Sequence, residues 1–209
     1  MKAGIFLLLM ISGVAGIMQA QPFEGGIMAG FVASQVDGDS YAGYDKAGLM
    51  GGVFISTKLT KVIGAQLEIH YTGKGARKPV SSDDPEVYKL SLHYLDIPVL
   101  ISFNVKQLVT FELGLVPGYL FAKGGEDDGG KLPDEFLVSY KKFDLATLAG
   151  IRFNVVEKLA VSFRYCYSIV SIRDGDSGAA YYSWMGNLFG YSTGDFNNYL
   201  TLGIYYKIK

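Results

Sequence analysis

The chain has 209 residues and a formal net charge of −1, with 27 glycines, 15 tyrosines and 13 phenylalanines but one tryptophan and one cysteine. No cluster of Lys and Arg marks a nucleic-acid surface, and the single Cys166 excludes an internal disulfide. Usage this rich in glycine and aromatic residues is typical of strands and of the aromatic belts that lie at membrane interfaces.

Residues 1–20 have the pattern of a secretion signal. Lys2 supplies the positive charge, Ile5 to Val14 form a short apolar core, and Gln19-Ala20 offers a cleavage site before Gln21. The apolar stretch is shorter than the roughly 20 residues that span a bilayer. We therefore expect a signal peptide over 1–20 and one domain over 21–209.

Alternating side chains define the strands of that domain. Between Leu159 and Ile169 the odd positions are large and apolar, whereas the even positions are small or charged, and Leu200 to Ile208 alternates in the same way. Successive side chains of a strand point to opposite faces, so each segment has one apolar face. This pattern predicts eight strands, at 25–36, 47–57, 62–72, 88–103, 108–122, 140–154, 159–172 and 197–208.

The connections alternate between short and long. Short turns at 58–61, 104–107 and 155–158 alternate with polar connections at 37–46, 73–87, 123–139 and 173–196. Short turns on one rim and long loops on the other are typical of outer-membrane barrels, in which closure satisfies every backbone group. The expected fold is all-β, an eight-stranded antiparallel transmembrane β-barrel in the bacterial outer membrane.

The alternation also assigns the two faces of the wall. Apolar residues such as Ile27, Leu67 and Val99 are expected to face lipid, while charged residues face a lumen that side chains fill. Buried charges must be paired, so we expect acids and bases to form one lumen network. Its members are Glu68, Asp96, Glu112, Asp144, Arg152, Arg164 and Lys207.

The fourth strand changes parity in this interpretation. Leu90, Leu92 and Tyr94 would face outward on even numbers, whereas Ile97 and Val99 would do so on odd numbers. One extra residue near Leu95-Asp96 would accommodate the change, as a β-bulge does.

Three other functions fit parts of the pattern. A polar lumen could form a narrow channel for small solutes or ions. A soluble ligand-binding barrel is a second alternative, although such a barrel is apolar inside. A lipid hydrolase is the third, because His70, His93, Glu68 and Ser91 supply the residue types of an acyl-transfer triad.

No cofactor or metal is expected. Asp37-Gly-Asp39 begins like a calcium loop but lacks the later acidic ligand, and the acidic stretch 124–130 has the composition of a solvated loop tip. Asp39 is instead expected to brace the first long loop through backbone hydrogen bonds.

Several segments resemble PorT-like outer-membrane β-barrel proteins. The similar stretches are 30–39, Gly43 to Gly48 with Gly52, Tyr94 to Leu100, Gly114 to Tyr119 and Ala149 to Phe153. The resemblance implies an outer-membrane location, an eight-stranded barrel and no catalytic residues. The founding member is tied to protein secretion, so a secretion-related assembly is one extension. The chain ends in Tyr206-Lys-Ile-Lys209, where the family tends to end on an aromatic residue.

These observations predict a non-enzymatic envelope protein, a monomeric barrel that contacts outer-membrane lipid and acts through its long loops. Loops carry binding residues on rigid scaffolds. The last long loop is rich in aromatic residues suited to a protein partner, and the candidate contacts are Tyr181, Tyr182, Trp184, Phe189 and Tyr191.

Overall fold

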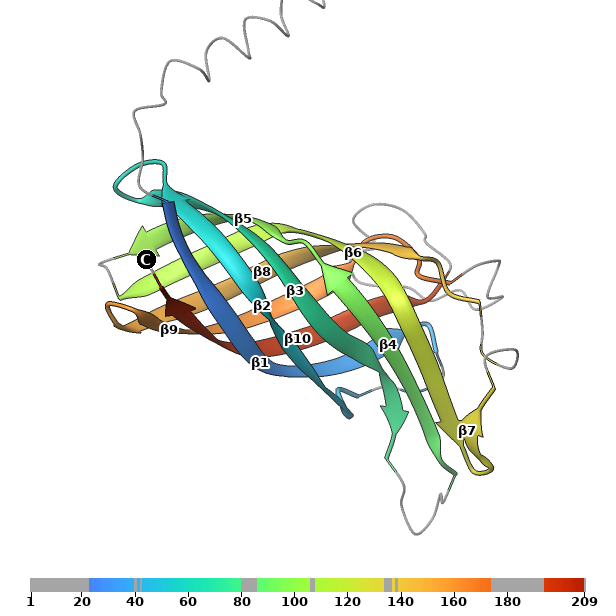
Figure 1. The fold of residues 1–209 in the computed structure, drawn as a ribbon. Coiled ribbons are helices and arrows are strands. Elements are labelled where there is room, and N and C mark those ends of the chain that lie inside the picture. The colour runs from blue at the N-terminus through green and yellow to red at the C-terminus, as the bar shows by residue number, and fades with distance from the viewer. Residues whose placement is uncertain are drawn as a thin grey trace, which may run out of the picture.

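The strands follow the alternating segments of the sequence. The computed structural model (Figure 1) describes residues 23–39, 41, 43–79, 86–105, 108–133, 137, 139–173 and 194–208. None of the described segments forms a helix long and apolar enough to cross a membrane. The strands are β1 (Phe23–Asp37), β2 (Lys46–Lys58), β3 (Ile63–Lys78), β4 (Tyr88–Asp96), β5 (Val99–Val105), β6 (Val109–Asp127), β7 (Gly130–Leu132), β8 (Phe143–Val156), β9 (Leu159–Ser168) and β10 (Phe196–Lys207).

Eight strand positions close into a ring. β1 pairs with both β2 and β10, and antiparallel pairs continue around the barrel. β4 and β5 share one position, since both lie between β3 and β6, and β7 pairs with β6 off the ring. The predicted eight-stranded antiparallel barrel is confirmed. We call the rim with the β2–β3, β5–β6 and β8–β9 turns the short-turn end, and the opposite rim the long-loop end.

The predicted fourth strand is split at Ile97-Pro98. Proline has no backbone N–H to donate to a sheet. Its carbonyl still accepts from Glu68 N at 3.0 Å, and Ile97 N donates to Pro117 O at 2.8 Å. The two segments therefore keep one position in the wall.

The predicted bulge near Leu95-Asp96 is wrong. The register between β3 and the β4/β5 position runs without a shift from Lys78↔Tyr88 to Ile63↔Phe103. The shift lies instead between His93 and Tyr94 on the β6 side, where the extra residue is Phe121. Leu90, Leu92 and Tyr94 are buried in the interior, so the fourth strand keeps one parity throughout.

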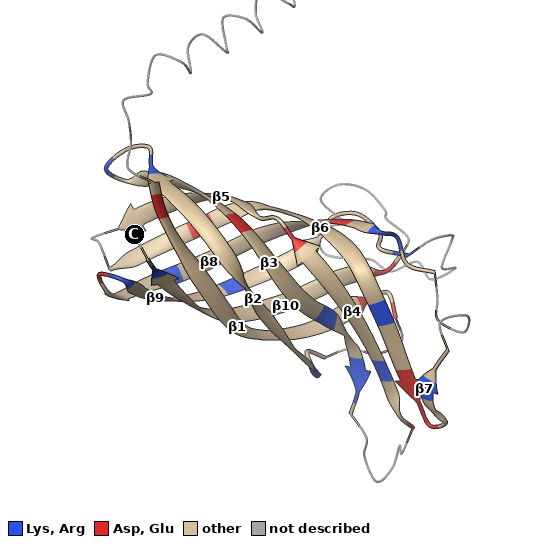
Figure 2. Ribbon diagram, viewed as in Figure 1, with Lys and Arg blue, Asp and Glu red and all other residues tan. Residues whose placement is uncertain are grey.

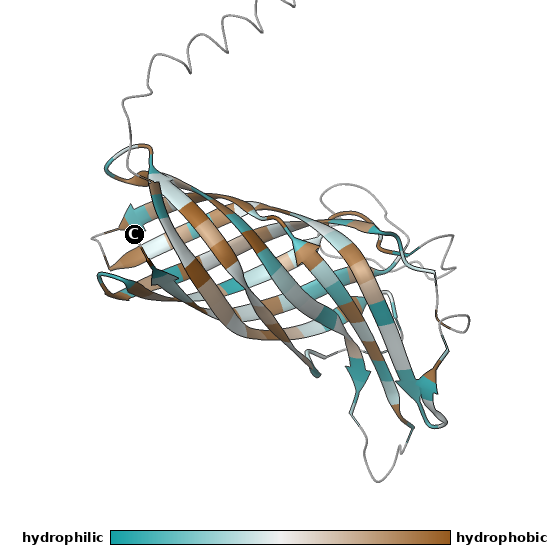
Figure 3. Ribbon diagram, viewed as in Figure 1, coloured by the Kyte–Doolittle hydropathy of each residue, from teal (hydrophilic) through white to brown (hydrophobic). Residues whose placement is uncertain are grey.

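The outer wall of the barrel is apolar. Side chains predicted to face outward are exposed, among them Phe31 at 68% and Val99 at 56%. Figure 3 shows brown bands on the strands, alternating with paler and teal residues. The same band is exposed at Ile27, Leu49, Val53, Leu67, Ile101, Leu113, Phe143, Phe163, Leu202 and Ile204.

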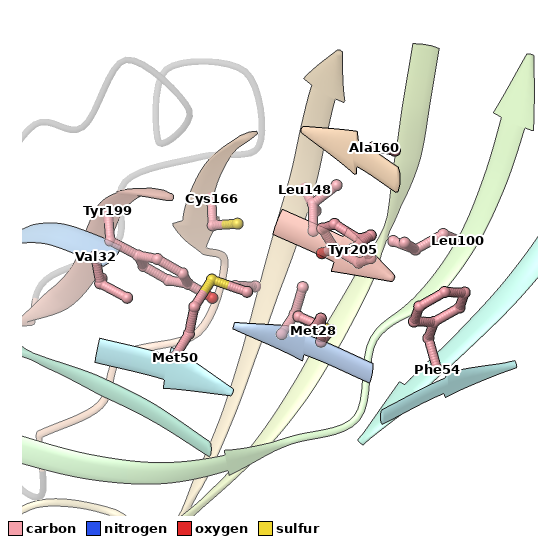
Figure 4. Packing of buried hydrophobic residues seen from close by; sticks show 12 residues of the cluster. Met28, Val32, Met50, Phe54, Leu100, Leu148, Ala160, Cys166, Tyr199 and Tyr205 are labelled. Atoms are coloured by element: carbon pink, nitrogen blue, oxygen red, sulfur yellow. The ribbon is translucent and has the colours of Figure 1, made fainter. Parts of the chain in front are cut away.

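The interior holds apolar as well as charged side chains. One cluster packs Met28, Met50, Leu148 and Tyr205 across the lumen, with Cys166 beside them (Figure 4). A second cluster lies at the long-loop end, and we call it the upper cluster. It consists of Val36, Ala76, Leu90, Leu92, Tyr94, Leu120, Tyr140 and Ile172.

Three strands continue beyond the barrel at the long-loop end. The β2–β3 pairing stops at Met50↔Thr72 and the β6–β8 pairing at Tyr119↔Phe143, but β3, β4 and β6 stay paired to Lys78, Tyr88 and Asp127. Figure 1 shows them extending past β1 and β2, with β7 at the tip. We call residues 73–78, 88–93, 120–127 and 130–132 the protruding sheet.

Gly75 fits a tight place in the protruding sheet. Its φ is +138°, and a Cβ would lie 2.0 Å from the backbone oxygen of Leu90. A residue with a side chain is excluded by both the conformation and the contact. The sequence predicts residues 73–78 to lie in a polar connection, whereas the structure places them in β3.

Candidate functional site

Four charged side chains from four strands meet in the lumen. Arg164 on β9 donates through Nη1 and Nη2 to the two oxygens of Glu68 on β3, at 2.9 and 2.7 Å, and through Nε to Glu112 on β6 at 2.7 Å. Arg152 on β8 donates to the other oxygen of Glu112. Arg164 is 1% exposed and Glu68 is 0% exposed. We call these residues the arginine network.

A second buried ion cluster lies on its long-loop side. Lys74 Nζ is 3.0 Å from Asp96 and 3.7 Å from Asp144, and it lies over the rings of Tyr94 and Tyr199 at 4.3 and 4.5 Å. Ser168 and Asn197 donate to Asp144 Oδ2 at 3.0 and 2.9 Å. We call Lys74, Asp96 and Asp144 the lysine cluster.

Sequence reasoning missed Lys74, which was assigned to a loop. The signal that could have found it is the even-numbered polar series Gln66, Glu68, His70 and Thr72, which continues to Lys74 if the strand is extended. The structure therefore places Asp96 and Asp144 with Lys74, and not with the arginines proposed for them.

Lys207 is also outside the arginine network, contrary to the sequence expectation. Its Nζ is 2.7 Å from Glu24 at the short-turn end, and its side chain is 30% exposed. The last strand reaches the rim at this residue, so its ammonium meets an acid of the first strand instead of the buried acids.

The two histidines lie on opposite sides of the wall. His70 is buried, with Nδ1 3.3 Å from Glu68 and Nε2 3.9 Å from Asp96, so it bridges the two ion clusters. Placing Leu92 and Tyr94 outward, as in the sequence-based interpretation, predicts His93 inside, but it lies outside, 2.7 Å from Tyr71 Oη and against Phe121. Ser91, two residues away on the same strand, shares that face. The wall thus separates His70 and Glu68 from Ser91, and the triad suggested by the sequence does not assemble from them.

The lumen opens at the short-turn end into a polar cavity, which we call the vestibule. Its volume is about 730 Å³. Arg152 forms part of its lining, together with hydroxyl and amide side chains and the rim cations Lys58, Lys61 and Lys207. At the opposite end, within the described part of the chain, the upper cluster packs in the interior.

The protruding sheet carries a row of charges on one face. Arg77, Lys89, Glu126 and Lys131 are direct neighbours on β3, β4, β6 and β7. Lys89 Nζ lies 3.0 Å from Glu126. Arg77 has a cation, Lys89, as its cross-strand neighbour. Figure 2 shows blue at the end of β3 and red at the end of β6 beside β7. We call these four residues the cationic row.

The carboxylates of Asp37, Asp39 and Asp195 lie near one another at the base of the first and last long loops. Asp37 accepts from Gln35 Nε2 at 2.6 Å and from Asn198 Nδ2 at 3.1 Å, and Asp39 Oδ1 accepts from the backbone N–H of Tyr41 at 2.9 Å. Burial raises the pKa of Asp39 to about 7; the Tyr41 N–H opposes this rise, and the charges of Asp195 and Asp37 add to it. The expected backbone contact of Asp39 is thus present.

We expect the stability of the first long loop to depend on the charge of Asp39. The folded pKa of Asp39 lies above its ordinary value of 3.8, so the folded state favours the protonated carboxyl. This contribution to stability is complete below pH 3.8 and is lost as the pH rises through about 7. Asp39→Asn keeps an acceptor for Tyr41 N–H but has no charge, so its heat-modified gel shift temperature should change less between pH 5 and pH 8 than that of the parent. Asp39→Ala should lower that temperature at both pH values. Equal pH dependence in parent and Asp39→Asn would contradict this role.

The aromatic contacts predicted for the last long loop, Tyr181, Tyr182, Trp184, Phe189 and Tyr191, lie outside the described residues. Within the described part of the chain, no group of three or more His, Cys, Asp or Glu side chains could hold a metal ion. Cys166 is a buried free thiol in the first apolar cluster.

Comparison with known proteins agrees with this geometry. The model of a family described as outer membrane protein beta-barrel domain matches residues 19–174. A comparison with curated proteins yields no match.

Solved structures of outer-membrane barrels are also similar. The crystal structure of Ail, the attachment invasion locus protein of Yersinia pestis, in complex with the heparin analogue sucrose octasulfate, has a TM-score of 0.50 and 18% identity, over 89% of this chain and 99% of that chain. Neisserial surface protein A has a TM-score of 0.49 and 12% identity, over 89% and 97%. OprG from Pseudomonas aeruginosa has a TM-score of 0.38 and 13% identity, over 89% and 94%. The likeness to Ail shows the fold.

Proposed function

Because this chain belongs to the outer membrane protein beta-barrel domain family and lies in the bacterial outer membrane, we propose that it is a non-enzymatic surface protein whose long-loop end binds anionic glycans. In such barrels the short turns face the periplasm and the long loops face outward. The soluble ligand-binding barrel raised from the sequence is wrong, since the wall faces lipid. The protruding sheet thus extends outside the cell.

The cationic row carries the proposal. Like charges directly opposite on neighbouring strands are destabilising, and Arg77 lies opposite Lys89 while a single acid, Glu126, pairs with Lys89. Arg77 and Lys131 are both exposed. A sulfated or phosphorylated glycan would offset that repulsion, because guanidinium and ammonium groups bind such oxyanions through charge-assisted hydrogen bonds. Ail has been crystallised with a heparin analogue, which makes a sulfated polymer a suitable first probe.

Two further observations favour surface binding over the other functions considered. The upper cluster packs buried apolar side chains at the outer end of the barrel, which supports a closed barrel over a channel for solutes or ions. The separation of His70 from Ser91 and His93 supports a non-enzymatic role over a lipid hydrolase. The cationic row is also what favours glycan binding over the secretion-related assembly.

Heparin binding by the full-length protein in detergent micelles tests the proposal. The double variant Arg77→Gln/Lys89→Gln should weaken binding about tenfold, from about 0.7 kcal/mol for each exposed cation, and added salt should weaken binding by the parent. Lys61→Gln/Lys158→Gln changes the net charge equally at the other end and should bind like the parent. The same loss in both double variants would mean that net charge, not the cationic row, attracts the polymer.

A further inference from the structure

The vestibule lies at the end of the barrel opposite the proposed glycan surface, and it has the size and lining of a ligand site. Its volume of about 730 Å³ lies within the roughly 300–1,000 Å³ typical of small-molecule pockets. The vestibule is surrounded by most of the barrel wall, because its lining side chains come from β1, β2, β3, β5, β6, β8 and β10. We propose that the vestibule binds a periplasmic peptide by its C-terminal carboxylate, with Arg152 as the residue that recognises the carboxylate.

Arg152 has unused capacity to donate hydrogen bonds. Its Nη2 donates to Glu112, whose other oxygen already accepts from Ser162 Oγ at 3.0 Å and Arg164 Nε at 2.7 Å. Arg152 Nε is buried and has no hydrogen-bond partner among the described residues. Glu112 cannot serve both of its arginines fully, so a second carboxylate beside Arg152 would complete the set. A planar guanidinium suits a planar carboxylate, which it can bind through two parallel hydrogen bonds.

The position of Arg152 is set before any ligand arrives. The guanidinium carbon lies 4.7 Å from the ring centroid of Tyr205, and Arg164 lies over the same ring at 5.0 Å. The side chain is 9% exposed and lines the vestibule. Because a cation held between a ring and an acid loses little freedom on binding, preorganisation favours affinity at this site.

The other lining residues of the vestibule suit the amides of a peptide. Thr110 Oγ1 donates to Asn104 Oδ1 at 2.8 Å, and Ser56, Gln66 and Ser102 add further hydroxyl and amide groups. Such groups can both donate to and accept from peptide bonds. These groups are neutral, so they suit the uncharged backbone of a peptide better than they suit a phosphate or sulfate group.

The rim attracts an anionic end. Four cations and two acids line the vestibule, and Glu24 is shared by Lys207 at 2.7 Å and Lys58 at 3.8 Å. The excess of positive charge raises the local concentration of anions at the entrance. The ligand therefore enters with its carboxylate first and its chain extending towards the periplasm.

Calorimetric titration of the full-length protein in detergent micelles tests the proposal. Ala-Ala-Ala with a free carboxylate should bind about tenfold more tightly than its C-terminal amide. Ser102→Phe, which narrows the vestibule without changing any charge, should weaken binding, whereas Ile101→Phe, on the lipid-facing side of the same strand, should bind like the parent. A gel mobility shift confirms that each variant is folded.

Several results would overturn the assignment. Equal affinity for the acid and the amide would exclude carboxylate recognition, and unchanged binding in Ser102→Phe would place the site elsewhere. Inorganic phosphate that binds as tightly as the tripeptide would leave a general anion site, and no heat of binding up to about 10 mM peptide would exclude the site altogether. A tripeptide that ends in D-alanine separates the two sources, because tighter binding of that form assigns the ligand to cell-wall peptides instead of protein C termini.

Discussion

Arg164→Met should destabilise the barrel by about 3–5 kcal/mol, because it leaves Glu68 and Glu112 buried with much of their compensating charge removed. Arg164 supplies both guanidinium nitrogens that donate to Glu68 and one of the two arginine contacts of Glu112. Arg152 remains to serve Glu112, but Glu68 then keeps Gln66 and His70 as its neighbours. Urea unfolding in lipid vesicles, followed by gel mobility, measures the loss.

The matched control for Arg164→Met is on the same strand. Phe163→Leu changes the neighbouring residue, whose side chain faces lipid and is 51% exposed, and it should cost much less. The double variant Glu68→Gln/Arg164→Met removes the orphaned charge of Glu68, keeps the pair of Arg152 with Glu112, and should recover a large part of the loss. A loss in Arg164→Met below about 1 kcal/mol would show that water or lipid headgroups reach these acids.

The strands could be predicted from the sequence because every strand of a closed membrane barrel alternates between side chains that face lipid and side chains that face the lumen. A slip of one residue would move a whole strand's apolar set from lipid to lumen. Even-numbered Glu68, Glu112 and Arg152 share the interior with Arg164, and odd-numbered Phe31 and Val99 share the exterior. The sequence could therefore place the arginine network in the lumen, although it could not give its pairing.

The misplaced bulge and the misplaced His93 come from one assumption, that the interior is polar along its whole length. Leu90, Leu92 and Tyr94 were assigned to the lipid face because they are apolar, and the bulge was then required to reconcile them with Val99. The lumen is instead apolar at the outer end, where the upper cluster packs. His93 was misplaced for the same reason, because placing Leu92 and Tyr94 outward turned the residue between them inward.

Pairing depends on contacts between strands far apart in the sequence, and the alternation carries no information about height within the barrel. Arg164 and Glu68 are 96 residues apart, whereas Lys74 and Asp96 are 22 apart on neighbouring strands. Strand tilt and register decide which of these residues share a level. Lys207 shows the effect, because its correct face still left it at the rim beside Glu24.

The order of layers along the lumen gives the molecule a direction. From the periplasm inward come the vestibule, the arginine network, the lysine cluster and the upper cluster. The arginine network and the lysine cluster are both buried, with Glu68 and Asp96 each 0% exposed. The two proposed binding surfaces are thus separated by a filled core, and each can be altered without changing the other.

Lys74→Met should cost about 3–5 kcal/mol, as large an effect as at Arg164, because Lys74 is the cation that Asp96 and Asp144 share. Its ammonium also contacts the faces of Tyr94 and Tyr199, so the substitution removes two cation–π contacts. Methionine keeps much of the side-chain volume, and the loss therefore reports on charge more than on packing. The measurement is again urea unfolding in vesicles.

Lys58→Met is the control, since the side chain of Lys58 is 72% exposed and its nearest acid is 3.8 Å away; it should change stability by less than about 0.5 kcal/mol. Replacing the whole lysine cluster in Lys74→Met/Asp96→Asn/Asp144→Asn should restore most of the loss, because a buried ion cluster exchanged as a unit leaves no orphaned charge. If the triple variant is as unstable as Lys74→Met alone, the lysine acts through packing against Tyr94 and Tyr199, and the buried acids do not depend on it.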